Sequence, residues 1–113
     1  MGEHIRIRNA SGKWVVRAGG AIVAESSEAK ELTEGDMPAV IYFPRGDVGM
    51  AFLEASDSAT RCPYKGQASY FNISTAAGDI PDAAWSYETP LERLSDIAGH
   101  IAFYGDKVTV EQL

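Results

Sequence analysis

The chain has 113 residues, of which 45% are apolar and 23% charged, a composition typical of one globular domain spanning residues 1–113. Its net charge of −6 argues against a nucleic-acid partner, because phosphate backbones are bound mainly through Lys and Arg. The chain contains one cysteine, and its apolar runs fall short of the roughly 20 residues of a membrane-spanning helix. We therefore expect a cytoplasmic protein with no internal disulfide and no membrane partner.

The first third of the chain predicts β-strands. HIRIRN alternates isoleucine with arginine, which is the period of a strand with one buried face. Gly19 and Gly20 then separate two β-rich runs, 14–18 and 21–25, and a Gly-Gly pair accepts the positive φ angles of a tight hairpin turn. We predict a hairpin here, then an acidic irregular stretch, and then a short strand in AVIYFP that ends at Pro44.

Two short helices are predicted from their start signals. The first follows Asp47, whose carboxylate is suited to accept hydrogen bonds from the free amides of a helix start. The second begins at Thr89, with Pro90 at the first helical position and Glu92 completing a capping box, and it runs to Ala98.

The remaining segments again have the pattern of strands. QASYFNIST and AAWSYE are rich in aromatic residues, and Trp85 and Tyr87 are expected on one face. HIAFY and KVTVEQ suggest a final hairpin that turns at Gly105 and Asp106. The expected fold is mainly β, an antiparallel sheet curled or folded on itself like a barrel or a sandwich, with one or two short helices.

The order of four motifs resembles a known family. YFP-RGDV, TRCPYKG-ASYF, AAWSYETP and IAFYGDKV follow one another over nearly the whole chain, as in the family called domain of unknown function 427. The resemblance implies a small, mainly β, intracellular bacterial domain, also found in some fungi, with no established substrate. The family sometimes carries a nucleotidyltransferase-type label, but the Gly-Ser turn and Asp-x-Asp pair of such enzymes are absent from this sequence.

Three polar residues are candidates for catalysis. Cys62 lies near Arg61 and Lys65, whose charges favour a thiolate, but the sequence places neither histidine beside it. Lys65 precedes Gly66 in a turn, where it is suited to meet an anion or to form a Schiff base, or is simply solvated. Asp47 is either the helix cap or an acid–base group. One cysteine and two histidines without zinc-site spacing predict no metal and no cofactor.

The aromatic residues indicate a ligand pocket. Five tyrosines and two tryptophans exceed what a dry core of this size accommodates, because each needs a hydrogen-bond partner when it is buried. We predict an aromatic-lined pocket for a small molecule near the CPYKG turn, lined by Tyr42, Lys65, Tyr70, Trp85 and Tyr87. Two alternatives stay open: an enzyme using Lys65, Asp47 or Cys62, and a protein-interaction module that pairs through an exposed sheet edge. An open edge would also suit a homo-oligomer.

Overall fold

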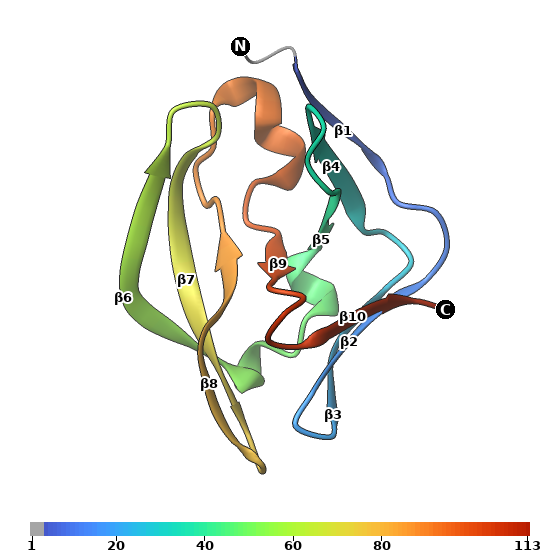
Figure 1. The fold of residues 1–113 in the computed structure, drawn as a ribbon, viewed down its shortest axis with the longest axis vertical. Helices are drawn as coiled ribbons and strands as arrows, with labels where there is room; N and C mark the ends of the chain where they lie inside the picture. Colours follow the sequence, from blue (N-terminus) through green and yellow to red (C-terminus); the bar gives the residue numbers. More distant parts are fainter. Residues whose placement is uncertain (1–3) are drawn as a thin grey trace.

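Two antiparallel sheets make up the computed structural model, which describes residues 4–113 (Figure 1). The larger sheet has seven strands in the order β1-β4-β5-β9-β8-β7-β6, and the smaller has three in the order β10-β2-β3. The strands are β1 (Ile5–Asn9), β2 (Trp14–Ala18), β3 (Ala21–Ser26), β4 (Lys30–Glu34), β5 (Val40–Phe43), β6 (Leu53–Cys62), β7 (Gly66–Thr75), β8 (Gly78–Ser86), β9 (Ile101–Phe103) and β10 (Thr109–Gln112). Three short 3-10 segments connect them, η2 (Arg45–Asp47), η3 (Met50–Phe52) and η4 (Glu92–Ile97).

The expected mainly β, folded architecture is therefore confirmed, as two packed sheets and not as a closed barrel. The predicted hairpin is present as β2 and β3, and its turn holds Gly19 at φ 56° and Gly20 at φ 82°. The CPYKG segment is also a turn, because Cys62 pairs with Gly66 at the end of the β6–β7 hairpin. Both hairpins follow from local sequence, since their turn residues accept the required φ angles.

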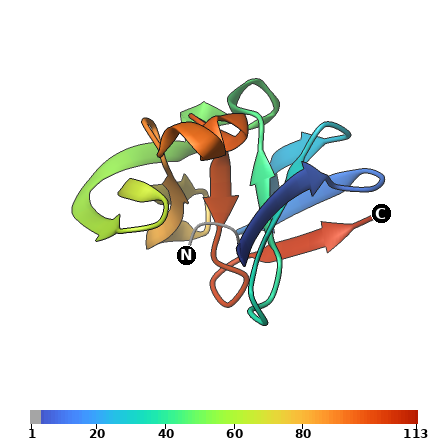
Figure 2. The ribbon, with the colours of Figure 1, turned by 90° about the horizontal axis from the view of Figure 1, so that it is seen from above.

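The larger sheet curls, so that one of its faces is concave. The wing formed by β6 and β7 and the wing formed by β1 and β4 lie on opposite sides of the molecule, with η4 between them at one end (Figures 1 and 2). Leu94 and Ile97 of η4 are buried against this face. The other face packs on the smaller sheet, and Phe43 and Phe103 fill that core in an edge-to-face pair with ring centroids 5.8 Å apart.

The helix predicted after Asp47 is wrong. The segment forms η2 and η3, and the chain then enters the long strand β6 at Leu53. The N–H of Gly49 donates to the Val23 carbonyl at 2.7 Å, and Val48 forms a bridge with Ala24. These contacts tie the segment to β3, so tertiary pairing overrides the local helical pattern.

The helix predicted after Thr89 is corrected in its start and its type. η4 is 3-10 and is preceded by Leu91, and within the described chain no side chain caps it. The N–H of Leu91 instead donates to the Lys65 carbonyl at 3.1 Å, which fixes this start against the β6–β7 turn.

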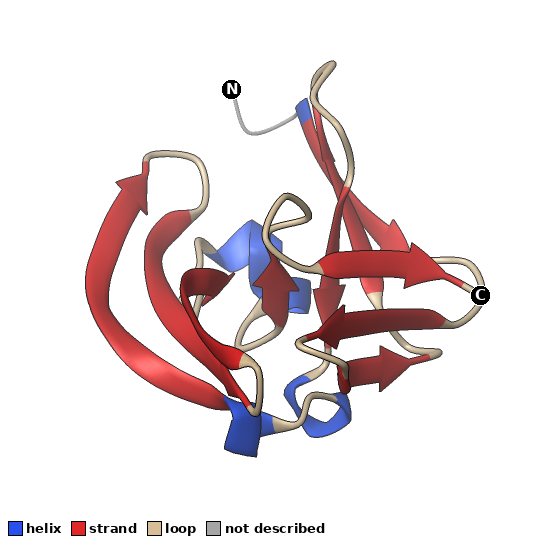
Figure 3. Ribbon diagram, turned by 60° about the horizontal axis from the view of Figure 1, so that its bottom comes forward, coloured by secondary structure: helices blue, strands red, loops and turns tan. Residues whose placement is uncertain are grey.

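The final hairpin is also wrong. Figure 3 shows β9 and β10 as separate arrows, and their partners differ: β9 pairs with β5 and β8, whereas β10 pairs with β2. The acidic stretch read as irregular contains β4, which pairs with β1 and β5. Among residues 4–113, no helix is long and apolar enough to cross a membrane.

Candidate functional site

Three of the five predicted ligand residues lie in one row across the concave face. The strand register sets Tyr42 opposite Ala102, Ala102 opposite Trp85, and Trp85 opposite Tyr70. Directly opposed residues of antiparallel strands point to the same face, so these side chains are neighbours. The Trp85 Nε1–H donates to the Tyr42 hydroxyl at 3.2 Å, and the two rings meet edge to face. Tyr87 belongs to the same buried cluster.

Burial turns two of these residues into core residues. Tyr42 is 1% exposed and Tyr87 is 7% exposed. Burial raises the pKa of Tyr42 to about 12 and also raises the pKa of Tyr87, because the phenolate would lose its hydration. Both phenols are therefore neutral at physiological pH. The buried Tyr42 hydroxyl therefore holds the Trp85 indole in position.

Lys65 joins the two wings of the curled sheet. Its Nζ donates to Glu34 Oε1 at 2.6 Å, and its side chain is 13% exposed. Glu34 also meets His4 Nε2 at 3.3 Å. The hydrogen bond from Lys65 and the nearby charges lower the pKa of Glu34, although burial acts in the opposite direction. This amine is held by a carboxylate from β4, so it has a structural partner in place of the free or desolvated state that a Schiff base requires.

The two other catalytic candidates, Cys62 and Asp47, have different surroundings. Cys62 is half-buried against the cluster inside the curl. Asp47 accepts a hydrogen bond from Ser26 Oγ at 2.6 Å and makes no cap bond with the described residues. Among residues 4–113, no group of three or more His, Cys, Asp or Glu side chains is arranged to hold a metal ion.

A cavity opens where the larger sheet splits. β5 and β9 pair at Tyr42 with Ala102 and at Phe43 with Ile101, and beyond these positions the strands part. Val40 pairs with β4, whereas Phe103 pairs with Ala84 of β8. The gap holds a cavity of about 360 Å³, which we call the central cavity. Its lining residues are Trp14, Glu31, Ala39, Val40, Ile41, Trp85, Phe103, Tyr104, Gly105 and Val110.

The walls of the central cavity come from both sheets. Trp85 and Tyr104 stand against each other with ring centroids 4.5 Å apart. Trp14 and Val110 of the smaller sheet line it as well. The indole N–H of Trp14 donates to the Ser11 carbonyl at 2.9 Å, which fixes that ring. Mostly apolar and aromatic walls with a small number of polar groups are the usual lining of a small-molecule site.

A second cavity, of about 640 Å³, lies beside Tyr104 and is lined by Tyr70 and polar side chains. Tyr70 and Thr60 share a hydrogen bond of 2.8 Å there. Asp82 has a φ of 48° at the bulge in β8, where its carboxylate accepts hydrogen bonds from Ser56 and Ser58 that lower its pKa. Of the predicted ligand residues, Trp85 lines the central cavity and Tyr70 lines this second one.

Sequence reasoning missed most of the central cavity, including Trp14, Glu31, Val40 and Tyr104. The cavity depends on β9 leaving β5 and on β10 joining β2, and the local pattern of HIAFY and KVTVEQ instead favoured a hairpin. No signal within either segment identifies its distant partner strand.

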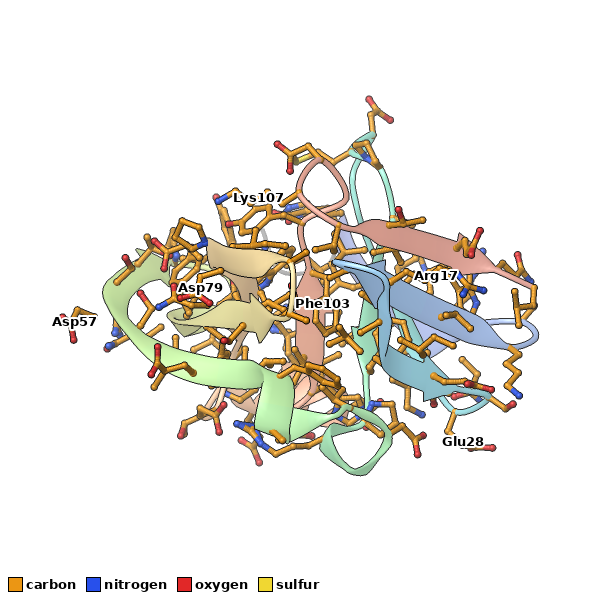
Figure 4. All side chains as sticks on the ribbon, turned by 90° about the horizontal axis from the view of Figure 1, so that it is seen from below. Arg17, Glu28, Asp57, Asp79, Phe103 and Lys107 are labelled. Atoms are coloured by element: carbon orange, nitrogen blue, oxygen red, sulfur yellow. The ribbon has the colours of Figure 1, made fainter. Side chains whose placement is uncertain are left out.

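Figure 4 shows Phe103 at the centre of the molecule, with Asp57 and Glu28 pointing away from it.

The fold and the cavity define this chain as a mainly β domain of two packed antiparallel sheets, one of them split around an aromatic cavity. The family model described as "Domain of unknown function (DUF427)" matches residues 6–112, so the chain belongs to this family. No curated protein matches the chain.

Proposed function

We propose that this domain binds a small ring-bearing molecule in the central cavity. The observation that carries the proposal is the cavity of about 360 Å³ between β5 and β9, with Trp14, Trp85 and Tyr104 in its walls. Its volume falls within the range of roughly 300–1,000 Å³ that is usual for ligand sites.

The aromatic walls support a ligand with a flat apolar part. Trp85 and Tyr104 are half-buried, so each has part of its ring packed in the protein and part facing the cavity. Aromatic rings gain from offset or edge-to-face contact with another ring, in addition to the area that they bury. Trp85 is also preoriented, because its indole N–H is bonded to the buried Tyr42 hydroxyl. A preoriented wall lowers the entropic cost of binding.

Two glycine positions offer a matched test of the site. A Cβ added at Gly105, which lines the central cavity, or at Gly46, which does not, would meet no atom within 4 Å. Gly105→Leu therefore places a side chain at the cavity wall without a clash at its Cβ, and Gly46→Leu is the control at an exposed position of η2 that does not line the cavity.

The measurement is a thermal-shift screen of aromatic and heteroaromatic metabolites against the parent protein and both variants. A ligand at a hundred times its dissociation constant adds about 2.7 kcal/mol of stability. We expect hits to raise the melting temperature of the parent and of Gly46→Leu, and to be lost in folded Gly105→Leu. Equal shifts in all three proteins, or no hit among ring compounds, would contradict the proposal.

A further inference from the structure

We infer that the ligand of the central cavity is a cation, an amine carried on an aromatic or other apolar ring. This inference rests on the proposed function and adds the charge class of the ligand to it. Two observations support the inference: the charge of the residues that line the cavity, and the hydrogen bonds that the basic side chains around the cavity already make.

Glu31 supplies the charge of the central cavity. Among the lining residues, all within the described part of the chain, it is the only side chain that is charged at neutral pH. Tyr104, the other ionisable group, stays a neutral phenol, because burial and its hydrogen bond to Tyr70 raise its pKa to about 12. A carboxylate beside aromatic walls attracts a cation more strongly than it would in bulk water, because the local dielectric constant is lower.

Arg8 is the present partner of Glu31, and it is a weak competitor for that carboxylate. Its Nε donates to Glu31 Oε1, but its side chain is 76% exposed, whereas the side chain of Glu31 is 21% exposed. The register places Arg8, Glu31 and Ile41 next to one another on β1, β4 and β5. A solvent-exposed arginine returns to water at little cost, since exposed ion pairs contribute at most about 1 kcal/mol. An ammonium group in the cavity can therefore take its place.

The aromatic wall is suited to the same charge. The Nζ of Lys107 lies 5.5 Å from the centroid of the Tyr104 ring and donates to the carbonyls of Pro81 and Asp82. The ring of Tyr104 thus already holds one ammonium by a cation–π contact, from the side of the second cavity. Trp14 and Trp85 also line the central cavity, and tryptophan is the aromatic side chain that binds a cation most strongly.

An anionic ligand finds no counter-charge at this site. Within residues 4–113, no basic side chain lines the central cavity. The nearest basic groups of the adjoining cavities, Arg8 and Lys107, are bonded to Glu31 and to two backbone carbonyls. A phosphate or carboxylate would be repelled by Glu31 and would find no basic side chain among the lining residues, so a nucleoside triphosphate is the wrong charge class for this cavity.

The test compares three ligands that share one ring: indole, tryptamine and indole-3-acetate. Isothermal titration at low salt measures their dissociation constants with the parent protein. We expect tryptamine to bind at least about fivefold more tightly than indole, and indole-3-acetate to bind more weakly than indole. The preference should shrink as salt is added, since the charges are partly exposed to solvent.

Variants of Glu31 and of its ion-pair partner Arg8 test whether the preference for tryptamine depends on the Glu31 carboxylate. Glu31→Gln should bring the three affinities together, whereas Glu28→Gln, which makes the same charge change at a side chain pointing away from the molecule, should preserve their order. Arg8→Gln removes the competitor and should tighten tryptamine binding.

The outcomes separate this inference from the proposed function. If the three ligands bind equally well, or if Glu31→Gln leaves their order unchanged, the cavity binds rings but the charge assignment is wrong. If none of the three binds, the cation inference fails, whereas the proposed function fails only if the thermal-shift screen also finds no hit among other ring compounds.

Discussion

Two buried serines, Ser26 and Ser86, have opposite surroundings. Ser26 is 3% exposed, and its hydroxyl donates to Asp47 and accepts from the Glu28 N–H. Ser86 is fully buried, and its hydroxyl finds no hydrogen-bond partner among residues 4–113. A buried hydroxyl without a partner lowers the stability of the folded state, because its hydrogen bonds to water are lost and no protein hydrogen bond replaces them.

These surroundings predict opposite effects of the same substitution. Ser86→Ala should leave the free energy of unfolding unchanged or raise it by up to about 1 kcal/mol, because it removes an unpaired polar group. Ser26→Ala should lower it by about 2–3 kcal/mol, because two hydrogen bonds are lost and one of them is to a carboxylate. Urea unfolding of both variants checks this, and a Ser86→Ala protein as destabilised as Ser26→Ala would reveal a missing partner of Ser86.

The Lys65–Glu34 pair predicts a pH dependence of stability. The pKa of Glu34 is lowered from its ordinary value of 4.5 in the folded protein. A lowered pKa contributes stability that is present above the unfolded value and is lost as the pH falls through the folded value. Lys65→Met should therefore cost about 1 kcal/mol at pH 7, with a smaller penalty as the pH drops below 4.5.

Urea unfolding at pH 7 and pH 3 measures this difference. Lys30→Met is the control, because the Lys30 amine donates to the neutral amide of Asn9 and its effect should not follow the titration of Glu34. A Lys65→Met penalty of the same size at both pH values would show that the pair does not act through the Glu34 charge.

At the residue level, the sequence indicates which aromatic side chains need hydrogen-bond partners, but not which of them are buried. The excess of tyrosine and tryptophan predicted an aromatic-lined pocket, on the ground that each buried phenol or indole needs a hydrogen-bond partner; the Trp85 indole N–H has such a partner in the Tyr42 hydroxyl. The same reasoning counted Tyr42 and Tyr87 as lining residues, because sequence alone does not reveal which side of an aromatic cluster is closed. η4 closes that side, through Leu94 and Ile97.

At the level of elements, the turn of the β2–β3 hairpin lies against Thr75 of the β7–β8 hairpin. A Cβ at Gly19 would overlap the hydroxyl of Thr75, whereas a Cβ at Gly20 would meet nothing within 4 Å. Both glycines have positive φ angles, so alanine is strained at either position. Alanine therefore strains the backbone at both positions, but only at Gly19 would its Cβ also overlap another side chain.

Gly20→Ala should therefore lower the free energy of unfolding by about 1 kcal/mol, the cost of the left-handed conformation alone. Gly19→Ala should lower it by roughly 2–4 kcal/mol, because overpacking against Thr75 is added to that cost. Thermal unfolding of the two variants gives the comparison. Equal losses would mean that the hairpins move apart freely.

Elements with local partners were predictable, and elements with distant partners were not. The β2–β3 hairpin has its turn signal between its own strands, so Gly19 and Gly20 sufficed to predict it. β10 pairs with β2, almost the whole chain away, and β9 pairs with β5 and β8 and not with β10. Such pairings are decided by burial in the assembled sheets, which local propensity does not report.

At the scale of the whole molecule, the two sheets jointly create the central cavity. β9 turns away from β5 to follow β8, and β10 crosses to the smaller sheet, where it brings Val110 beside Trp14. A site built at the junction of two sheets is common for ligand binding, since neither sheet alone encloses the space.

The most direct test of this account is an NMR titration of the isotope-labelled protein with tryptamine. Binding in the central cavity predicts shifts centred on the backbone amides of residues 31, 39–41, 103–105 and 110 and on the indole N–H signals of Trp14 and Trp85. Shifts centred on the β6–β7 turn around Lys65, or no shifts at millimolar ligand, would contradict the central claim that this split in the sheet is the binding site.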